Sequence, residues 1–254
     1  MEKEILKMYK ALLFIALVFL PQISLADVGI IPGIDIQLDD SDGNQAEVAT
    51  AIKIILGLTV LSLAPAILIA MTAFTRIIIV LSMLRHAFGM QQTPPNTVLI
   101  SLALFLTVFN MLPNFQSIKD EAFIPYMEGN IGEEQAFNHG MGYMRDFMIR
   151  QTREEDLMLM VEVSGSERPD TVEDIGTFLL IPAFMLSELK SAFQIGFVIF
   201  LPFLLIDLVV ASILMSMGML MVPPMMISLP IKVLMFVLID GWNLVVYALL
   251  NSFS

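Results

Sequence analysis

The chain has 254 residues, of which 57% are hydrophobic and 15% are charged, and its formal net charge at pH 7 is −12. Soluble domains carry about 25% charged residues, so this composition favours an integral membrane protein. The acidic balance excludes nucleic acid as a partner, because binding to phosphates requires clustered lysine and arginine.

Residues that build metal sites or catalytic centres are scarce. There is no cysteine, which excludes disulfides, thiolate catalysis and thiolate-bound metals. His86 and His139 lie far apart, without a second histidine or a carboxylate at metal-ligand spacing. No Gly-rich phosphate loop, G-x-S-x-G or H-E-x-x-H sequence is present. We therefore expect neither a cofactor nor an enzymatic activity.

The N-terminal residues have the pattern of a signal peptide. Three lysines precede the apolar run from Ala11 to Leu20, and a small-x-small sequence ends at Ala26. This pattern predicts a signal peptide over residues 1–26; an uncleaved membrane helix is the alternative, but about ten apolar residues are short for one. Cleavage after Ala26 would leave residues 27–46 as a flexible, acidic segment outside the cytoplasm.

Residues 47–112 predict a first helical hairpin. Its first arm carries Pro65 in the interior, where a proline kinks or breaks a helix. Pro94 and Pro95 form the turn, and a second apolar segment then runs up to Pro113. Both arms approach the roughly 20 apolar residues that a helix needs to cross a hydrocarbon core.

Residues 113–176 form an acidic insert, because they hold 14 acidic and 5 basic residues, a net charge of −9. Apolar residues from Phe137 to Met148 recur at three- and four-residue steps and predict an amphipathic helix in the core of a small helical domain. The charged run Arg150–Asp156 is expected to be a solvated face with local charge pairing. With the N-terminus outside, the insert is expected in the periplasm and the first turn in the cytoplasm.

Residues 177–254 predict a second helical hairpin that turns at Pro223 and Pro224. Several of the chain's 20 methionines crowd around this turn. Methionine is unbranched and adaptable, so the cluster either fills an irregular space or forms a compliant constriction, and the sequence leaves both open. The predicted fold is all-α, with two long kinked helical hairpins and a small helical periplasmic insert.

Seven charged residues interrupt the apolar stretches of the two hairpins: Arg76, Arg85, Glu188, Lys190, Asp207, Lys232 and Asp240. An Asp, Lys or Arg at the centre of a membrane helix costs about 2.5 to 3.5 kcal/mol, so these side chains must face protein or a wet cavity. Because the signs nearly balance, we expect them to pair with one another and to fix the helix register. A proton relay is the functional alternative.

Three sequence blocks carry a resemblance to a known family. They are FTRIIIVLSMLRHAFGMQQTPPN (Phe74 to Asn96), LLIPAFMLSELKSAFQIGFVIFLPFLLIDLVVASILMSMGMLMVPP (Leu179 to Pro224) and ISLPIKVLMFVLIDGW (Ile227 to Trp242). In this order they resemble the FliP/SctR family, the export-gate proteins of flagellar and virulence type III secretion systems, and the flagellar branch fits better. The resemblance extends over nearly the whole chain after the N-terminal segment, apart from the acidic insert.

The resemblance implies a pore-forming core subunit of the flagellar export gate, which conducts unfolded flagellar substrates across the inner membrane at the basal body. Several copies of the chain, about five, would assemble with FliQ and FliR into a helical pore complex, alongside FlhB and FlhA and partly on the periplasmic side. The family also implies that Met219, Leu220 and Met221 narrow the closed pore as an apolar gasket. Leu220 stands here where the family pattern has a third methionine.

An ion-coupled secondary transporter built from the two hairpins is the alternative function. Glu188, Asp207 and Asp240 would then carry the coupled ions. Four helices are few for a self-contained transporter, so either function requires an oligomer. An intramembrane enzyme is poorly supported, because the sequence offers neither a nucleophile with its base nor a metal cluster.

Overall fold

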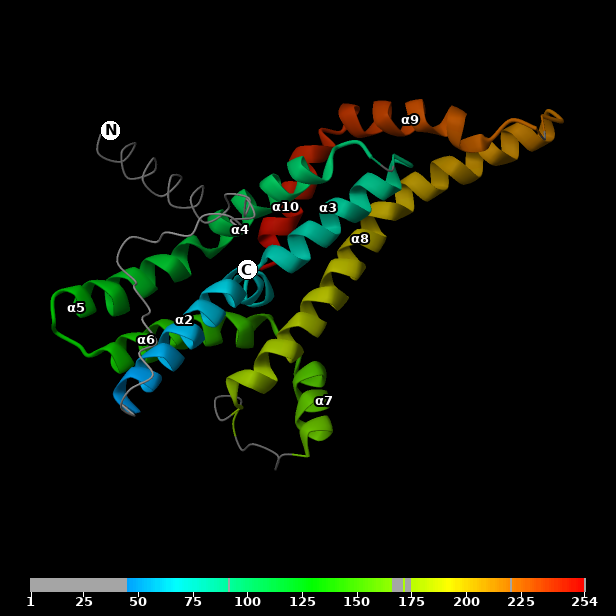
Figure 1. Cartoon of the computed structure of the whole chain (residues 1–254). Helices are drawn as coiled ribbons and strands as arrows, with labels where there is room; N and C mark the ends of the chain where they lie inside the picture. The colour runs from blue at the N-terminus through cyan, green and yellow to red at the C-terminus, as the bar shows by residue number, and fades with distance from the viewer. Residues whose placement is uncertain (1–44, 91, 166–170, 172–174, 220, 254) are drawn as a thin grey trace, which may run out of the picture. The chain divides into compact units, whose positions relative to one another are not determined.

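Helices make up all the regular structure in the described part of the chain, which comprises residues 45–90, 92–165, 171, 175–219 and 221–253 (Figure 1). This computed structural model confirms the all-α prediction. The chain divides into two units, residues 1–52 and 53–254, and the second contains every helix after α2 (Gln45–Ala70). The predicted signal peptide with its cleavage site at Ala26 lies outside the described residues, as does most of segment 27–46.

The first predicted arm consists of two helices. Helix α2 continues through Pro65, and α3 (Phe74–Ala87) begins after a break at residues 71–73. At this break the Phe74 N–H donates to the Thr72 hydroxyl at 3.5 Å. The arm is broken as expected, but the break lies beyond Pro65.

Helix α4 (Asn96–Ile118) continues through Pro113, where the sequence predicted the end of the apolar segment. A proline removes one helical hydrogen bond, and the turns on either side of it keep theirs, so the helix is not obliged to stop. It passes directly into a π-helical turn, η1 (Lys119–Phe123), and then into α5 (Ile124–Met127). The predicted boundary between the first hairpin and the acidic insert therefore falls inside one continuous helical stretch.

The second hairpin is formed by α8 (Thr177–Ser216) and α9 (Pro224–Leu238), which pack against each other and are joined by the methionine-rich turn (Figure 1). Its return arm includes a further helix, α10 (Gly241–Asn251), which follows α9 at an angle of 67°. Asp240 lies at this bend with a φ of 51°, a left-handed conformation that aspartate tolerates better than most residues.

The two longest helices within the acidic insert, α6 (Glu133–Gln151) and α7 (Glu154–Ser164), both pack against α8. The ring centroid of Phe147 in α6 lies 5.8 Å from that of Phe184 in α8. The sequence placed the whole stripe from Phe137 to Met148 in a core, but Phe137 is 67% exposed. Only the C-terminal part of α6 reaches the core, and that core is shared with α8.

The core is centred on α3. Its buried apolar side chains recur at three- and four-residue steps, and five of them are at most 1% exposed: Ile77, Val80, Leu81, Leu84 and Ala87. Helix α3 packs against both α4 and α8. The approach to α8 is close, because a Cβ added at Gly196 would lie 2.3 Å from the sulfur of Met83.

Aromatic rings join the end of α3 to the second hairpin. The Phe88 ring lies 5.0 Å from that of Phe203 in α8 and 4.8 Å from that of Phe236 in α9, measured between centroids. Phe236 in turn meets Trp242 of α10 edge-on at 5.5 Å. Such ring pairs contribute about 0.5 to 1.5 kcal/mol beyond their buried area. They fix α9 and the start of α10 against the core.

Two helical stretches of the described chain are long and apolar enough to cross a membrane. They are residues 96–127, a stretch of 32 residues, and α8, a helix of 40 residues; the most apolar 18-residue segments within them have mean hydropathies of 1.9 and 2.7. Helices α9 and α10 together form a third, bent candidate. At a rise of 1.5 Å per residue, α8 is about 60 Å long, twice the thickness of a hydrocarbon core of about 30 Å.

Candidate functional site: a methionine-rich turn on a hairpin braced by ion pairs

Helix α8 is terminated by a glycine that follows its C-cap residue, Met217. Gly218 has a φ of 74°, which a residue without a Cβ adopts readily. Its N–H donates to the Met215 carbonyl, and the Met219 N–H donates to the Leu214 carbonyl, both at 3.0 Å. This pair of bonds is a Schellman motif, which satisfies the last carbonyls of a helix and reverses the chain. The sequence Met217–Gly218 therefore sets the point at which the turn begins.

The four turn prolines lie where the sequence placed them, between the arms of the two hairpins. Pro94 and Pro95 separate α3 from α4, and Pro95 directly precedes the first residue of α4. Pro223 is the N-cap of α9, and Pro224 is its first residue. Proline is favoured at the start of a helix, because the first N–H groups have no helical acceptor.

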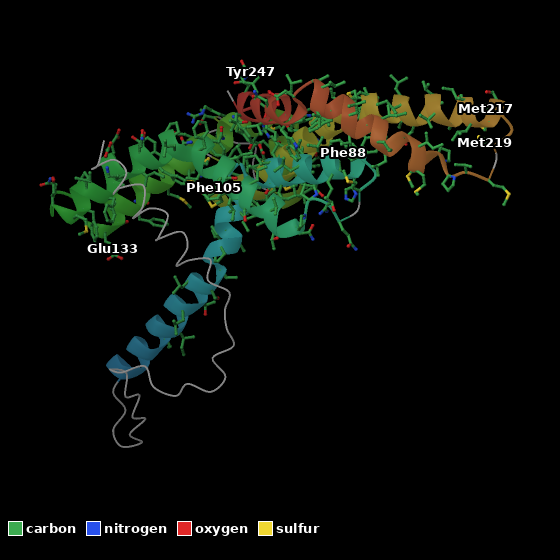
Figure 2. All side chains as sticks on the ribbon, turned by 90° about the horizontal axis from the view of Figure 1, so that it is seen from above. Phe88, Phe105, Glu133, Met217, Met219 and Tyr247 are labelled. Carbon is green, nitrogen blue, oxygen red and sulfur yellow. The ribbon has the colours of Figure 1, made fainter. Side chains whose placement is uncertain are left out.

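Methionine side chains project from the turn between α8 and α9. Met219 is 43% exposed and Met221 is 97% exposed, whereas Leu220, the third predicted gasket residue, lies outside the described residues. Figure 2 shows Met217 and Met219 at this turn, with sulfur in yellow. We call the exposed methionines of this region the turn methionines: Met215, Met217, Met219, Met221, Met225 and Met226.

An ion pair joins the two arms of the hairpin. The Lys232 ammonium in α9 donates to Asp207 Oδ2 of α8 at 2.6 Å and to the Ala87 carbonyl, at the end of α3, at 3.1 Å. The Ser228 hydroxyl donates to the other carboxylate oxygen of Asp207 at 2.6 Å. The Lys232 side chain is 4% exposed and that of Asp207 is 37% exposed. These bonds hold α9 in register with α8 and attach both helices to α3.

A second, fully buried pair lies at the base of the hairpin. The Arg76 guanidinium of α3 donates through Nε to Glu188 Oε2 at 2.9 Å and through Nη2 to Oε1. The two side chains are 4% and 0% exposed. The remaining Arg76 donors reach Gln151 Oε1 at 3.0 Å and the Ser252 carbonyl at 2.6 Å, and the Phe253 ring centroid lies 3.9 Å from the guanidinium carbon. Arg76 thus joins α3, α8, the end of α6 and the residues after α10.

The third pair links the acidic insert to α8. The Lys190 ammonium and the Ser187 hydroxyl of α8 both donate to Asp156 of α7, the hydroxyl at 2.7 Å. The Arg153 N–H donates to the Ser187 hydroxyl at 2.9 Å. Burial raises the pKa of the Asp156 carboxyl, but the bonds from Lys190 and Ser187 and the nearby positive charges outweigh burial and hold this pKa below its ordinary value. Asp156 is therefore a fixed anion at neutral pH.

The buried role of Asp156 was not predicted from the sequence, because the charged run Arg150–Asp156 was expected to be a solvated face. That expectation is wrong for Asp156, which is 1% exposed. One signal was available: Asp156 lies one helical turn before Met160 and beside the apolar stripe that includes Leu157 and Val161. No sequence pattern of this kind predicted that Gln151 and the C-terminal residues would contact Arg76.

Two of the predicted pairing residues have no opposite charge within ion-pair distance in the described chain. Arg85 donates to Asn96 Oδ1 at 2.5 Å and to the Pro94 carbonyl at 3.3 Å, so it stabilises the first turn through polar bonds. Asp240 is exposed at the bend before α10 and accepts a bond from Asn243 Nδ2 at 3.2 Å. The prediction of mutual pairing is wrong for these two residues, because both lie next to chain reversals: Arg85 Nη1 reaches neutral oxygens of the first turn, and Asp240 is exposed to solvent.

The arrangement offers little for catalysis. In the residues that the structure describes, no group of three or more histidine or carboxylate side chains could hold a metal ion. Glu188, Asp207 and Asp156 are each committed to a cation. What the geometry provides is a braced hairpin with exposed, apolar and unbranched thioether side chains at its turn.

Comparison with known proteins shows the family to which a chain with this hairpin belongs. The FliP family profile matches residues 57–249, which include the turn methionines and the three ion pairs described above. The flagellar biosynthetic protein FliP of Bacillus subtilis (strain 168) is 52% identical over 213 residues, which cover 84% of this chain and 96% of that protein. The chain belongs to the FliP family. FliP proteins of Borreliella burgdorferi and Aquifex aeolicus are 45% and 46% identical, over 84% and 86% of this chain and 85% and 91% of their own lengths.

Membership of the FliP family confirms the resemblance that the three sequence blocks carried. The matched region begins inside α2 and ends inside α10, so it contains most of both hairpins and the whole acidic insert between them. The Arg76 contacts with Ser252 and Phe253 extend just beyond it.

Proposed function

We propose that this FliP-family chain is a pore-forming core subunit of the flagellar type III protein export gate, through which unfolded flagellar subunits cross the bacterial inner membrane. Its relatives are named flagellar biosynthetic proteins, which supports a role in building the flagellum. The observation that supports a pore is the turn between α8 and α9, where Met219 and Met221 are exposed on a hairpin braced by one buried and one partly buried ion pair.

The chemistry of the turn methionines suits a seal. Thioether side chains are unbranched with three rotatable bonds, so they can deform around a passing chain and close again behind it. Apolar constrictions stop ions, because water inside them lacks hydrogen-bond partners. Several copies of the chain around one axis would bring their turns together at such a constriction. Leu220, between Met219 and Met221 in the sequence, is also apolar and so keeps the constriction apolar.

The buried charges support a scaffold rather than ion transport. A relay carboxylate must exchange its proton and its partners during each cycle. Glu188 is instead held by two hydrogen bonds from the Arg76 guanidinium. Asp207 is held by Lys232 and Ser228 together. These fixed bonds favour the export-gate proposal over a secondary transporter.

The proposal includes an assembly and a topology. Several copies of the chain would form the gate core with FliQ and FliR, next to FlhB and FlhA in the export apparatus at the basal body. Removal of the signal peptide after Ala26 and placement of the acidic insert on the periplasmic side belong to the same proposal. It requires no cofactor and no enzymatic activity of this chain.

The test replaces Met219 and Met221 together by alanine in cells that assemble the gate. We expect a normal yield of the complex in mild detergent, together with loss of membrane potential through ions that leak past the shortened side chains. Met127→Ala is the matched control, since Met127 is 68% exposed but belongs to α5. A complex of normal yield without any leak in the double variant would contradict the proposed constriction.

A further inference from the structure

The turn methionines form the one cluster of exposed thioethers in the described part of the chain. The sequence contains no cysteine, so methionine is its only oxidisable sulfur. Met127 is the one other methionine with an exposed side chain among the described residues, whereas Met71, Met111 and Met148 are at most 5% exposed. We propose that the turn methionines are a reversible oxidation site, which peroxides convert to methionine sulfoxide.

The reaction is an oxygen transfer that needs no protein group other than the thioether. A sulfur lone pair of Met221 attacks one oxygen of hydrogen peroxide, the O–O bond breaks and an S–O bond forms. The sulfur loses two electrons, and the peroxide is reduced to water. A methionine sulfoxide reductase with a dithiol reverses the step: the oxygen leaves as water and the dithiol becomes a disulfide.

The product has different physical properties from the thioether. Methionine sulfoxide is polar and accepts hydrogen bonds, whereas the thioether is apolar and flexible. Oxidation at Met219 and Met221 would therefore give water a partner inside the constriction, and hydration of an apolar constriction is what opens it to ions. This consequence rests on the proposed function, but the oxidation itself rests only on exposure and chemistry.

The first experiment measures the chemistry alone. The full-length chain in mild detergent is treated with hydrogen peroxide, and peptides are followed by mass spectrometry for the gain of one oxygen. We expect the peptide with Met219 and Met221 to be oxidised several-fold faster than the peptides with Met111 and Met148, and Met127 to react as fast as the turn. Oxidation of Met219 and Met221 at the rate of Met111 and Met148 would overturn the proposal.

The second experiment measures the consequence in cells. Cells with the parent chain, with Met219→Leu and Met221→Leu together, or with Met127→Leu are exposed to peroxide, and each strain is compared with its own untreated culture. Leucine keeps an apolar side chain and cannot be oxidised, so we expect a peroxide-induced leak in the parent and in the Met127 variant and its loss in the double variant.

The two proposals fail in different ways. A peroxide-induced leak of equal size in the double leucine variant would overturn the oxidation switch and leave the pore intact. Absence of a leak in the double variant Met219→Ala and Met221→Ala would overturn the proposed pore, while faster oxidation of the turn peptide would still establish the modification site. Recovery of the seal after treatment with methionine sulfoxide reductase and a dithiol is expected; an irreversible leak would contradict reversibility.

Discussion

Replacing Glu188 by alanine should strongly destabilise the chain. The change leaves the Arg76 guanidinium, whose side chain is 4% exposed, without a counter-charge in the core. Breaking a buried ion pair by removing one partner costs about 3 to 5 kcal/mol. For a chain of this size, 1 kcal/mol corresponds to about 2 to 4 °C in melting temperature, so a decrease of about 6 to 20 °C is expected.

The assay is thermal unfolding of the full chain in mild detergent, followed by circular dichroism. Lys119→Ala is the control, because Lys119 and Asp120 form an exposed pair at 3.7 Å, and such a pair is worth at most about 1 kcal/mol. Replacing Arg76 by methionine and Glu188 by leucine in the same chain should recover part of the loss, since no lone charge remains buried. A melting temperature of the Glu188 variant equal to that of the Lys119 control would refute the argument.

Two further predictions concern the contacts of α8. Gly196→Ala places a methyl group 2.3 Å from the Met83 sulfur and should cost about 1 to 3 kcal/mol, whereas Gly142→Ala meets nothing within 4 Å and should be neutral or stabilising; equal melting temperatures would contradict the close approach. Because the pKa of Asp156 is lowered by Lys190 and its neighbours, its contribution to stability is complete above the ordinary aspartate pKa of about 3.9 and is lost as the pH falls through the lower folded-state pKa. Melting curves recorded from neutral to acid pH should therefore converge for the parent and Asp156→Asn; a constant difference down to the most acid pH would contradict the pairing.

The hairpins could be predicted because their turns are encoded locally. The prolines at Pro94–Pro95 and Pro223–Pro224 lack an N–H and favour helix starts, so a few residues determine where each return arm begins. The continuation of α4 through Pro113 shows the limit of the same rule. A proline inside a long helix costs one hydrogen bond, and packing against α3 and α6 decides whether the helix survives that loss.

The partners of the buried charges could be predicted only in part. The sequence contains nearly equal numbers of positive and negative residues in the two hairpins, which predicted that they pair. The structure places Arg76 beside Glu188 and Lys232 beside Asp207. Lys190 instead pairs with Asp156, a residue of the acidic insert that local charge density had assigned to solvent. Long-range pairing depends on which helices pack together, and neither periodicity nor charge sign contains that information.

The length of α8 bears on what surrounds it in the cell. Its charged groups are satisfied within the chain, and its outer side carries an exposed apolar stripe: Phe193, Phe197, Leu201, Leu204 and Leu208. A helix of about 60 Å would need a tilt of about 60° to lie within a hydrocarbon core of about 30 Å, whereas spanning helices tilt by at most about 40°. Part of α8 must therefore lie outside the hydrocarbon, where its apolar residues would meet water unless a protein surface covers them. Lipid alone cannot cover α8, and this favours neighbouring subunits as the surroundings of the hairpin that carries the turn methionines.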